Sequence, residues 1–131
     1  MYLYAHNARI YAYIHVYIAK MEMLVYKFTE TDMREKDIEK KLVDGIKRLG
    51  GCAYKWVSPG RDGVPDRIVV LPGGIIWFVE LKTDTGRLSP RQQFQLNFLN
   101  SLGFNTTVVR GMSECRQFLL DREKEVELRG V

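Results

Sequence analysis

Between residues 33 and 49, apolar side chains recur every three or four positions, which is the spacing of an amphipathic helix. Projected at about 100° per residue, they occupy one arc of about 140°. These apolar residues are Ile38, Leu42, Val43, Ile46 and Leu49. A cap signal at Thr31 or Asp32 and a stop signal at Gly50 and Gly51 bound the stretch. The pattern predicts a helix of about 17 residues.

Three short apolar runs follow this helix, each bounded by turn-forming residues. Residues 52 to 57, 66 to 71 and 75 to 82 are typical of strands, and the loop "SPGRDGVP" and the turn "PGG" separate them. The third run is apolar on both faces, which favours a central strand. The three-residue turn pairs Leu71 with Ile75, and counting back along the hairpin places Asp66 opposite Glu80.

The remaining pattern predicts a helix, a strand and a closing helix. Ser89 and Pro90 are a cap and a first helical residue, and the helix they begin ends at Gly103. Residues 104 to 110 are typical of a strand, and residues 112 to 128 of a helix with a charged tail. The order α-β-β-β-α-β-α predicts an α/β domain with a central sheet flanked by helices.

Two carboxylates stand together at the open end of the predicted hairpin. Directly opposed side chains have Cβ atoms about 4.5 to 5.5 Å apart, and like charges at that distance repel. Glu80 and Lys82 share one face of the strand because they are two residues apart. Singly, Asp66 is explained as a turn residue, and Glu80 with Lys82 as a surface pair. Their joint occurrence favours a functional site.

Two further acids lie on the core-facing arc of the first helix. Glu35 falls in the first turn, where the helix dipole stabilises a negative charge. Glu39 lies deeper in the helix and has no such stabilisation. A surface pair with a neighbouring lysine explains Glu39 alone, but its inward position makes it the preferred helix acid for a site.

These residues form a recognisable pattern. Pro65 and Asp66, then thirteen residues, then Glu80-Leu81-Lys82 constitute a PD-(D/E)xK motif on a hairpin. Together with "SPGRDGVPDRIVV", "FVELK" and the helix entry "GRLSPRQ" that contains Gln92, it resembles the VRR-NUC family of nucleases. The resemblance runs from about residue 33 to residue 120. It implies a restriction-endonuclease-like fold with a mixed sheet, and a metal-dependent DNA endonuclease.

The resemblance also implies a role for each residue. Asp66, Glu80 and the Leu81 carbonyl would bind Mg²⁺ or Mn²⁺, for which hard oxygen ligands are suited. Lys82 would orient or deprotonate the attacking water and stabilise the developing charge. Glu39 would bind the same ion directly or through water, with Glu35 as its rival. Gln92 is similar to the family's glutamine that positions the lysine or the water.

The substrate expectation also comes from the resemblance. Small stand-alone members, typically from phages and bacteria, act as homodimers on branched DNA such as four-way (Holliday) junctions. We therefore expect a homodimer that cuts branched DNA in the cytoplasm of a bacterial or phage-infected cell, without a small-molecule cofactor. A flap or nicking nuclease in phage DNA processing is one alternative. A non-catalytic DNA-binding module with a degenerate site is the other.

The net charge of the chain mildly favours a polyanionic binding partner. Twenty Lys and Arg residues against sixteen Asp and Glu residues give a formal net charge of +4. Five basic residues are the candidates for contacts with DNA phosphates: Lys55, Arg61, Arg67, Arg87 and Arg91. Cys52 and Cys115 lie far apart without a metal-binding spacing, so neither a zinc site nor a disulfide framework is predicted.

The chain divides into three predicted parts. Residues 1 to 32 are an extension that we expect to be weakly ordered and that an upstream start codon would explain. Charged residues interrupt its apolar runs before they reach the length of a membrane span, so no membrane partner is expected. Residues 33 to 121 are the nuclease domain. Residues 122 to 131 are a charged C-terminal tail.

Overall fold

The computed structural model describes residues 2–31 and 34–130, and the side chains of residues 7–25 and 34–130. The chain separates into two compact units, Met1–Asp32 and Met33–Val131.

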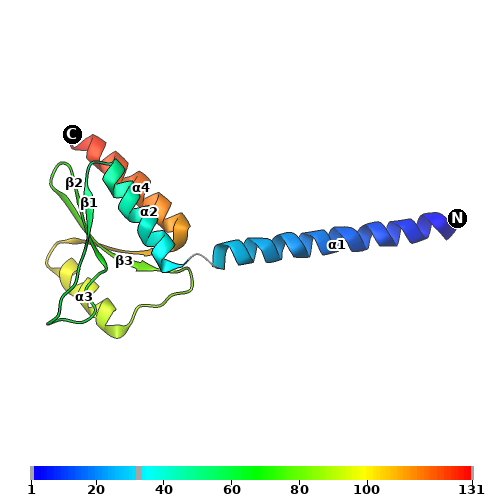
Figure 1. Ribbon diagram of the computed structural model, residues 1–131, viewed down its shortest axis with the longest axis horizontal. Coiled ribbons are helices and arrows are strands. Elements are labelled where there is room, and N and C mark those ends of the chain that lie inside the picture. The colour runs from blue at the N-terminus through cyan, green and yellow to red at the C-terminus, as the bar shows by residue number, and fades with distance from the viewer. Residues whose placement is uncertain (1, 32–33, 131) are drawn as a thin grey trace. The chain divides into compact units, whose positions relative to one another are not determined.

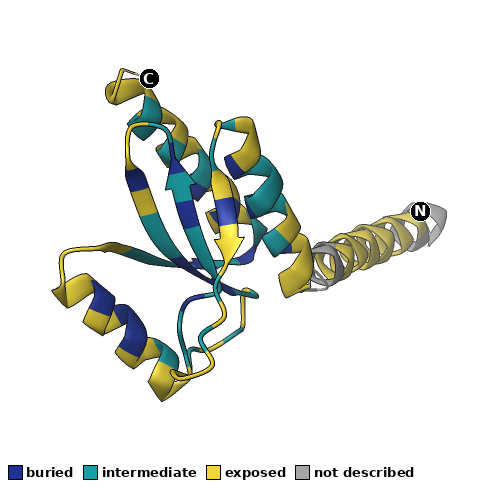
Figure 2. Cartoon of the chain, turned by 60° about the vertical axis from the view of Figure 1, so that its left-hand side comes forward, coloured by how far each residue is buried: buried dark blue, intermediate teal, exposed yellow. Residues whose placement is uncertain are grey.

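The first unit is the helix α1, Tyr2–Thr31 (Figure 1). The sequence pattern predicts a weakly ordered extension here, whereas the structure forms a continuous helix. The physical reason is local, because residues 1 to 32 contain neither glycine nor proline, the two residues that disfavour a helix most. The described side chains of α1 are exposed (Figure 2). Within the described part of the chain, no helix is both long enough and apolar enough to cross a membrane.

The second unit opens with α2, Glu35–Arg48. Its N-cap is Arg34, whose N–H donates to the Asp37 carboxylate at 3.2 Å. The predicted cap at Thr31 is wrong, since Thr31 ends α1, and the alternative, Asp32, lies outside the described residues. The helix is therefore shorter at its start than the apolar pattern predicts. Its apolar arc is correct, because Ile38, Leu42 and Ile46 are fully buried.

Four strands form one mixed sheet in the order β1-β2-β3-β4. Their bounds are Cys52–Lys55 for β1, Arg67–Leu71 for β2, Ile75–Lys82 for β3 and Asn105–Arg110 for β4. β1 and β3 both pair antiparallel with β2, whereas β3 and β4 run parallel. The hairpin pairs run from Leu71 with Ile75 to Arg67 with Val79, which confirms the register predicted from the turn.

Helices flank this sheet. The last two are α3, Pro90–Ser101, and α4, Gly111–Leu128. Figure 1 shows α2 and α4 side by side on one face of the sheet, and the core lies between them and the odd-numbered residues of β2 and β3. α3 packs against β4, apart from α2 and α4. Because side chains alternate along a strand, the even-numbered residues of β3, including Glu80 and Lys82, face away from α2.

Candidate active site

Asp66 and Glu80 meet at the open end of the β2–β3 hairpin. One step beyond the last ladder pair, Arg67 with Val79, Asp66 stands opposite Glu80. The Leu81 N–H donates to Asp66 Oδ2 at 2.8 Å, so the backbone of Leu81 points toward β2. Asp66 and Glu80 therefore occupy a non-hydrogen-bonded position, where opposed Cα atoms are only about 4.5 Å apart and side chains are closest.

Glu80 is a buried acid with an incomplete set of partners. Its side chain is 1% exposed. Oε1 accepts a hydrogen bond from Gln92 Nε2 at 3.0 Å and lies 3.8 Å from Lys82 Nζ. No donor among the described residues reaches the buried Oε2. A buried carboxylate oxygen without a donor is costly, so this atom is a natural ligand for a cation.

The pKa of Glu80 also shows that its negative charge is poorly stabilised. Burial raises the pKa of Glu80 from its ordinary 4.5 to about 8. The Asp66 carboxylate adds to this increase through charge repulsion and through hydrogen bonding to the protonated form, and Glu35 adds repulsion. Lys82 acts in the opposite direction but is outweighed. Glu80 therefore holds a proton at neutral pH until a positive charge replaces it.

The Leu81 carbonyl points toward the same site, and Pro65 offers it no backbone donor. In an antiparallel ladder the N–H and C=O of one residue point toward the same neighbouring strand, so the Leu81 carbonyl also points toward β2. Continuing the register places Pro65 opposite Leu81. Proline has no N–H to donate. Pro65 therefore cannot donate a backbone hydrogen bond to the Leu81 carbonyl, which lies beside Asp66 and Glu80.

Gln92 and Lys82 complete one side of the site. The capping box of α3 fixes Gln92, because Ser89 N–H donates to Gln92 Oε1 at 2.9 Å and Gln92 N–H donates to Ser89 Oγ at 3.2 Å. The other end of the same amide donates to Glu80. Lys82 is 15% exposed, so its ammonium is held close to Glu80 with limited access to water. The amide orients Glu80, and the ammonium supplies the local positive charge.

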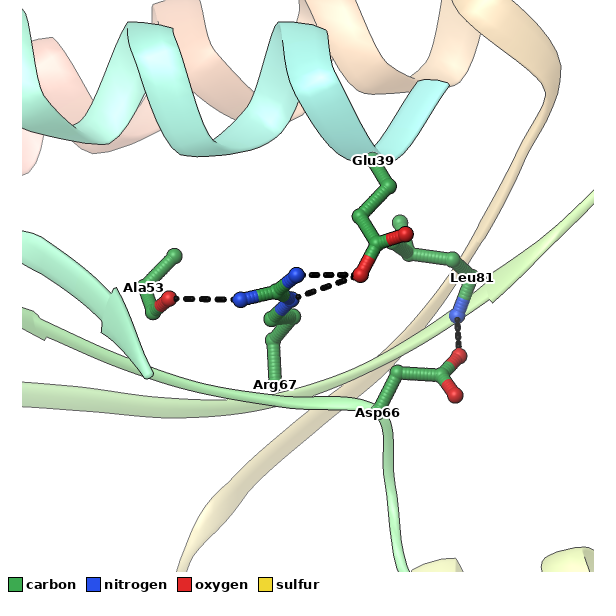
Figure 3. A network of polar contacts seen from close by, with 5 residues as sticks. All are labelled: Glu39, Ala53, Asp66, Arg67 and Leu81. Carbon is green, nitrogen blue, oxygen red and sulfur yellow. Dashed lines mark hydrogen bonds and ion pairs between the residues drawn. The ribbon is translucent and has the colours of Figure 1, made fainter. Parts of the chain in front are cut away.

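Glu39 does not join this cluster. Its Oε1 accepts from Arg67 Nε at 3.1 Å and also forms an ion pair with Arg67 Nη2, while Arg67 Nη1 donates to the Ala53 carbonyl at 3.1 Å. Figure 3 shows the Arg67 guanidinium between Glu39 and Ala53, and the Asp66 carboxylate directed at Leu81. Glu35, the rival acid on α2, contributes to the raised pKa of Glu80.

Comparison with known proteins identifies the family of this chain. The VRR-NUC domain family matches residues 19–113. This chain belongs to that family. A solved VRR_NUC domain structure is 31% identical with a TM-score of 0.62, and the match covers 65% of this chain and 92% of that one. "Putative nuclease p44" of Acyrthosiphon pisum secondary endosymbiont phage 1 is 48% identical over 77 residues, or 59% of this chain and 83% of p44.

The VRR-NUC match confirms the family and the restriction-endonuclease-like fold class predicted from the sequence. It supports a nuclease, that is, a hydrolase that acts on DNA. Metal dependence, branched substrates and a homodimer are finer predictions, which the match does not address.

The five basic residues predicted to contact DNA fall into two groups, exposed and partly buried. Lys55, Arg61, Arg87 and Arg91 are exposed, and Arg91 forms an ion pair with Asp62. Arg67 is partly buried and is engaged by Glu39 and Ala53, so its guanidinium is directed into the protein. The first four therefore lie where a phosphate can reach them, whereas Arg67 has a structural partner.

Two polar residues at the start of α3 and in the adjoining loop were not identified from the sequence. Asp62 holds Arg91 at the start of α3, and Gln95 is a buried polar residue of that helix. Gln95 falls between Gln92 and Leu96, on the same side as the buried Leu99. A polar residue on the inward side of an otherwise ordinary helix is the signal that could have identified it.

The donor set of the site fits one class of ion. Among the side chains of residues 7–25 and 34–130, no three His, Cys, Asp or Glu residues are grouped closely enough to hold a metal ion by themselves. Asp66, Glu80 and the Leu81 carbonyl offer oxygen only. Mg²⁺ and Mn²⁺ accept such a partial set, because Mg²⁺ usually keeps several waters and is bound through one or two carboxylates and substrate phosphates. The unpartnered Oε2 of Glu80 is the structural observation that favours a cation here.

Proposed function

We propose that this chain is a Mg²⁺- or Mn²⁺-dependent DNA endonuclease that hydrolyses phosphodiester bonds at the end of the β2–β3 hairpin. The observation that carries the proposal is Glu80, a buried acid with a raised pKa and an unpartnered oxygen beside a second carboxylate. Such a pair is electrostatically unfavourable in the free protein and becomes favourable when a divalent ion binds.

Each side chain has a distinct task in the proposed mechanism. Asp66, Glu80 and the Leu81 carbonyl would hold the ion, which supplies neutralisation of the phosphate charge and a more acidic water. Glu80 loses its proton on forming this site. Gln92, fixed by the α3 cap, keeps Oε1 of Glu80 in place. Lys82, close to the same oxygen, orients the attacking water and stabilises the negative charge that develops on the phosphate.

The helix carboxylate is the part of the proposal with two candidates. Glu39, the preferred acid from the sequence, would need to exchange its pair with Arg67 for the ion or for a water bound to it. Glu35 is exposed and already acts electrostatically on Glu80. The effect of Glu35 on the pKa of Glu80 supports Glu35 for a water-mediated contact, and the ion pair of Glu39 with Arg67 supports a role for Glu39 in holding β2 against α2.

The proposed substrate is branched DNA such as a four-way junction, cut by a homodimer. The support is the family resemblance, together with the exposed basic residues Arg61, Arg87 and Arg91. Two sites related by a twofold axis would permit paired cuts across a junction. A flap or nicking nuclease is the second candidate, favoured by a cavity at the start of α3 that could take an unpaired nucleotide.

A cleavage panel tests the proposal. Labelled junction, flap, nicked and linear duplex DNAs of one sequence are incubated with protein in Mg²⁺, in Mn²⁺ and in EDTA. We expect cleavage only with metal and faster cleavage of the junction than of the linear duplex. Asp66→Asn, purified in parallel, should abolish it, and Lys82→Ala should slow it by about 100-fold or more. Equal rates on junction and linear DNA would exclude branch selectivity, and unchanged cleavage by both variants would exclude this site. Sedimentation of the full chain measures the dimer.

A further inference from the structure

A cavity of about 360 Å³ lies between the β1–β2 loop and the first turns of α3. We call it the α3 cavity. Its lining residues are Arg61, Asp62, Pro90, Arg91, Phe94 and Gln95. Its volume is within the range of about 300 to 1,000 Å³ found for small-molecule pockets.

The wall of the α3 cavity is held together by two contacts. The guanidinium of Arg91 forms an ion pair with the carboxylate of Asp62, which ties α3 to the loop. Gly63 brings the loop backbone against the backbone of Arg91, since a Cβ at Gly63 would lie 2.7 Å from the Arg91 carbonyl carbon. Gly63 also has a φ of +83°, which side chains rarely adopt. The loop and the first turn of α3 therefore form one preformed surface.

Gln95 gives the α3 cavity a polar group. The residue is only 8% exposed and lines the cavity, and its amide makes no hydrogen bond to another residue in the described part of the chain. The amide is not among the buried side-chain atoms that lack a partner, so the cavity leaves it open to water or to a ligand. A side-chain amide offers both donors and an acceptor, so it suits a ligand with a polar edge of the same kind.

Phe94 and the two arginines define the rest of the ligand. Phe94 is 63% exposed at the cavity although its ring lies parallel to the Phe98 ring, with the two centroids 6.4 Å apart. Much of the Phe94 ring is therefore still accessible to another planar group. Arg61 and Arg91 outweigh the single negative charge of Asp62. A planar group with a polar edge and a nearby negative charge matches this lining, and a nucleobase with its phosphate has this chemistry.

The α3 cavity adjoins the candidate active site. Gln92, which contacts Glu80, and Gln95, which lines the cavity, are three residues apart on one helix. Their positions differ by only about 4.5 Å along the helix axis. A strand whose phosphate lies at Glu80 can therefore place a nearby nucleotide at the cavity.

We propose that the α3 cavity binds an unpaired nucleobase of the DNA strand next to the cleaved phosphodiester. The base stacks on Phe94 and hydrogen-bonds to Gln95, while Arg61 and Arg91 contact its flanking phosphates. The inference rests on the proposed nuclease function. A base inside an intact duplex is stacked and paired, so it must leave the helix to enter such a pocket. The cavity thus selects DNA with an unpaired nucleotide beside the cut, at a flap, a gap or an open branch point.

Binding measurements in EDTA test the inference without cleavage. The dissociation constant of the full chain is measured by fluorescence anisotropy for a flap DNA and for a fully paired duplex of equal length. Phe94→Ala should weaken flap binding about 5- to 140-fold, as expected for loss of one base–aromatic stack, and leave duplex binding unchanged. Phe94→Trp should restore flap binding. Gln95→Met, which keeps the volume, should weaken flap binding about 2- to 12-fold.

A matched control separates the α3 cavity from the general surface of the helix. Leu102 is an exposed apolar residue at the C-cap of α3, 56% exposed, and does not line the cavity. Leu102→Ala should leave flap binding unchanged. Equal losses for Leu102→Ala and Phe94→Ala, or equal losses on flap and duplex, would overturn the proposal and indicate an apolar docking surface instead.

Abasic DNA supplies the second arm of the test. Removing the bases from the unpaired nucleotides should weaken wild-type binding at least as much as Phe94→Ala does, because the stack and the Gln95 hydrogen bond are both lost, and it should weaken the variant less than it weakens wild type. Tight wild-type binding to abasic flaps would overturn the inference. The same DNAs are then offered to wild type with Mg²⁺. Cleavage without dependence on Phe94 rejects the base-binding role alone, whereas Phe94-dependent binding without any cleavage rejects the nuclease proposal and keeps the binding site.

Discussion

Glu80 should make the metal-free protein less stable as pH rises, and Glu80→Gln should remove that dependence. The pKa of Glu80 in the folded protein is about 8, above its ordinary value of 4.5. Below pH 4.5 the carboxyl is protonated in both the folded and the unfolded chain. Between these values the folded chain keeps a proton that the unfolded chain has lost, so the free energy of unfolding falls as pH rises. Above pH 8 the loss is complete.

The size of the effect follows from the same two values. At about 1.36 kcal/mol per pH unit, the interval from 4.5 to about 8 corresponds to about 5 kcal/mol. Glu80→Gln replaces the acid by a neutral group of the same shape, which can still accept from Gln92 and can donate to Asp66. The variant should therefore match wild type near pH 5 and exceed it by about 3 to 5 kcal/mol at pH 9.

Urea unfolding in EDTA between pH 5 and pH 9 measures the difference. The fluorescence of Trp56 and Trp77, both partly buried, reports on the second unit. Glu127→Gln, an exposed position on α4, is the control for loss of a carboxylate as such and should follow the wild-type curve. Parallel pH curves for wild type and Glu80→Gln would refute the reasoning, because they would show that Glu80 ionises in the folded protein as easily as in the unfolded one.

Three further predictions concern the ion, the lysine and the helix acids. Because Glu80 is protonated at pH 7, binding of Mn²⁺ should release close to one proton per ion at pH 7 and almost none above pH 9. Calorimetric titration in buffers of different ionisation enthalpy measures the number of protons released. Lys82→Ala should lower kcat on junction DNA by about 100-fold or more, while the dissociation constant measured by anisotropy in EDTA changes less than about threefold. Glu39→Gln should lower the free energy of unfolding by about 1 to 3 kcal/mol because Arg67 loses its charged partner. Glu35→Gln should lower the pKa of Glu80, so the pH-dependent fall in stability should end at a lower pH and be smaller than in wild type.

The hairpin was predictable from the sequence because its turn fixes its register. Three residues between Leu71 and Ile75 determine every later pair, and the alternation of side chains then brings Asp66 and Glu80 together. The α3 cap was predictable for the same kind of reason, since Ser89 and Pro90 are local signals. Strand bounds deviate from the predicted ones by at most two residues.

The partner of Glu39 depends on information that periodicity lacks. Alternation places Arg67 on the same face of β2 as Val69 and Leu71. Which helix covers that face is a tertiary property, and only α2 packed there brings Arg67 to Glu39. An inward acid therefore looks the same in the sequence whether it meets a metal ion or an arginine. For α1 the absence of glycine and proline removes the two residues that disfavour a helix most, which is compatible with the helix observed there.

The two residues of the Pro65-Asp66 pair act together through the backbone of β3. The proline ends the ladder with no N–H to offer, so the register leaves the Leu81 carbonyl without a backbone donor from β2. For the Leu81 N–H, the Asp66 carboxylate takes the place of a backbone acceptor from β2, since it accepts this N–H at 2.8 Å. This hydrogen bond fixes Asp66 beside Glu80. The residues that end the sheet thus also place several oxygen atoms together at one site. Until a cation binds there, the proton that Glu80 retains supplies the missing positive charge.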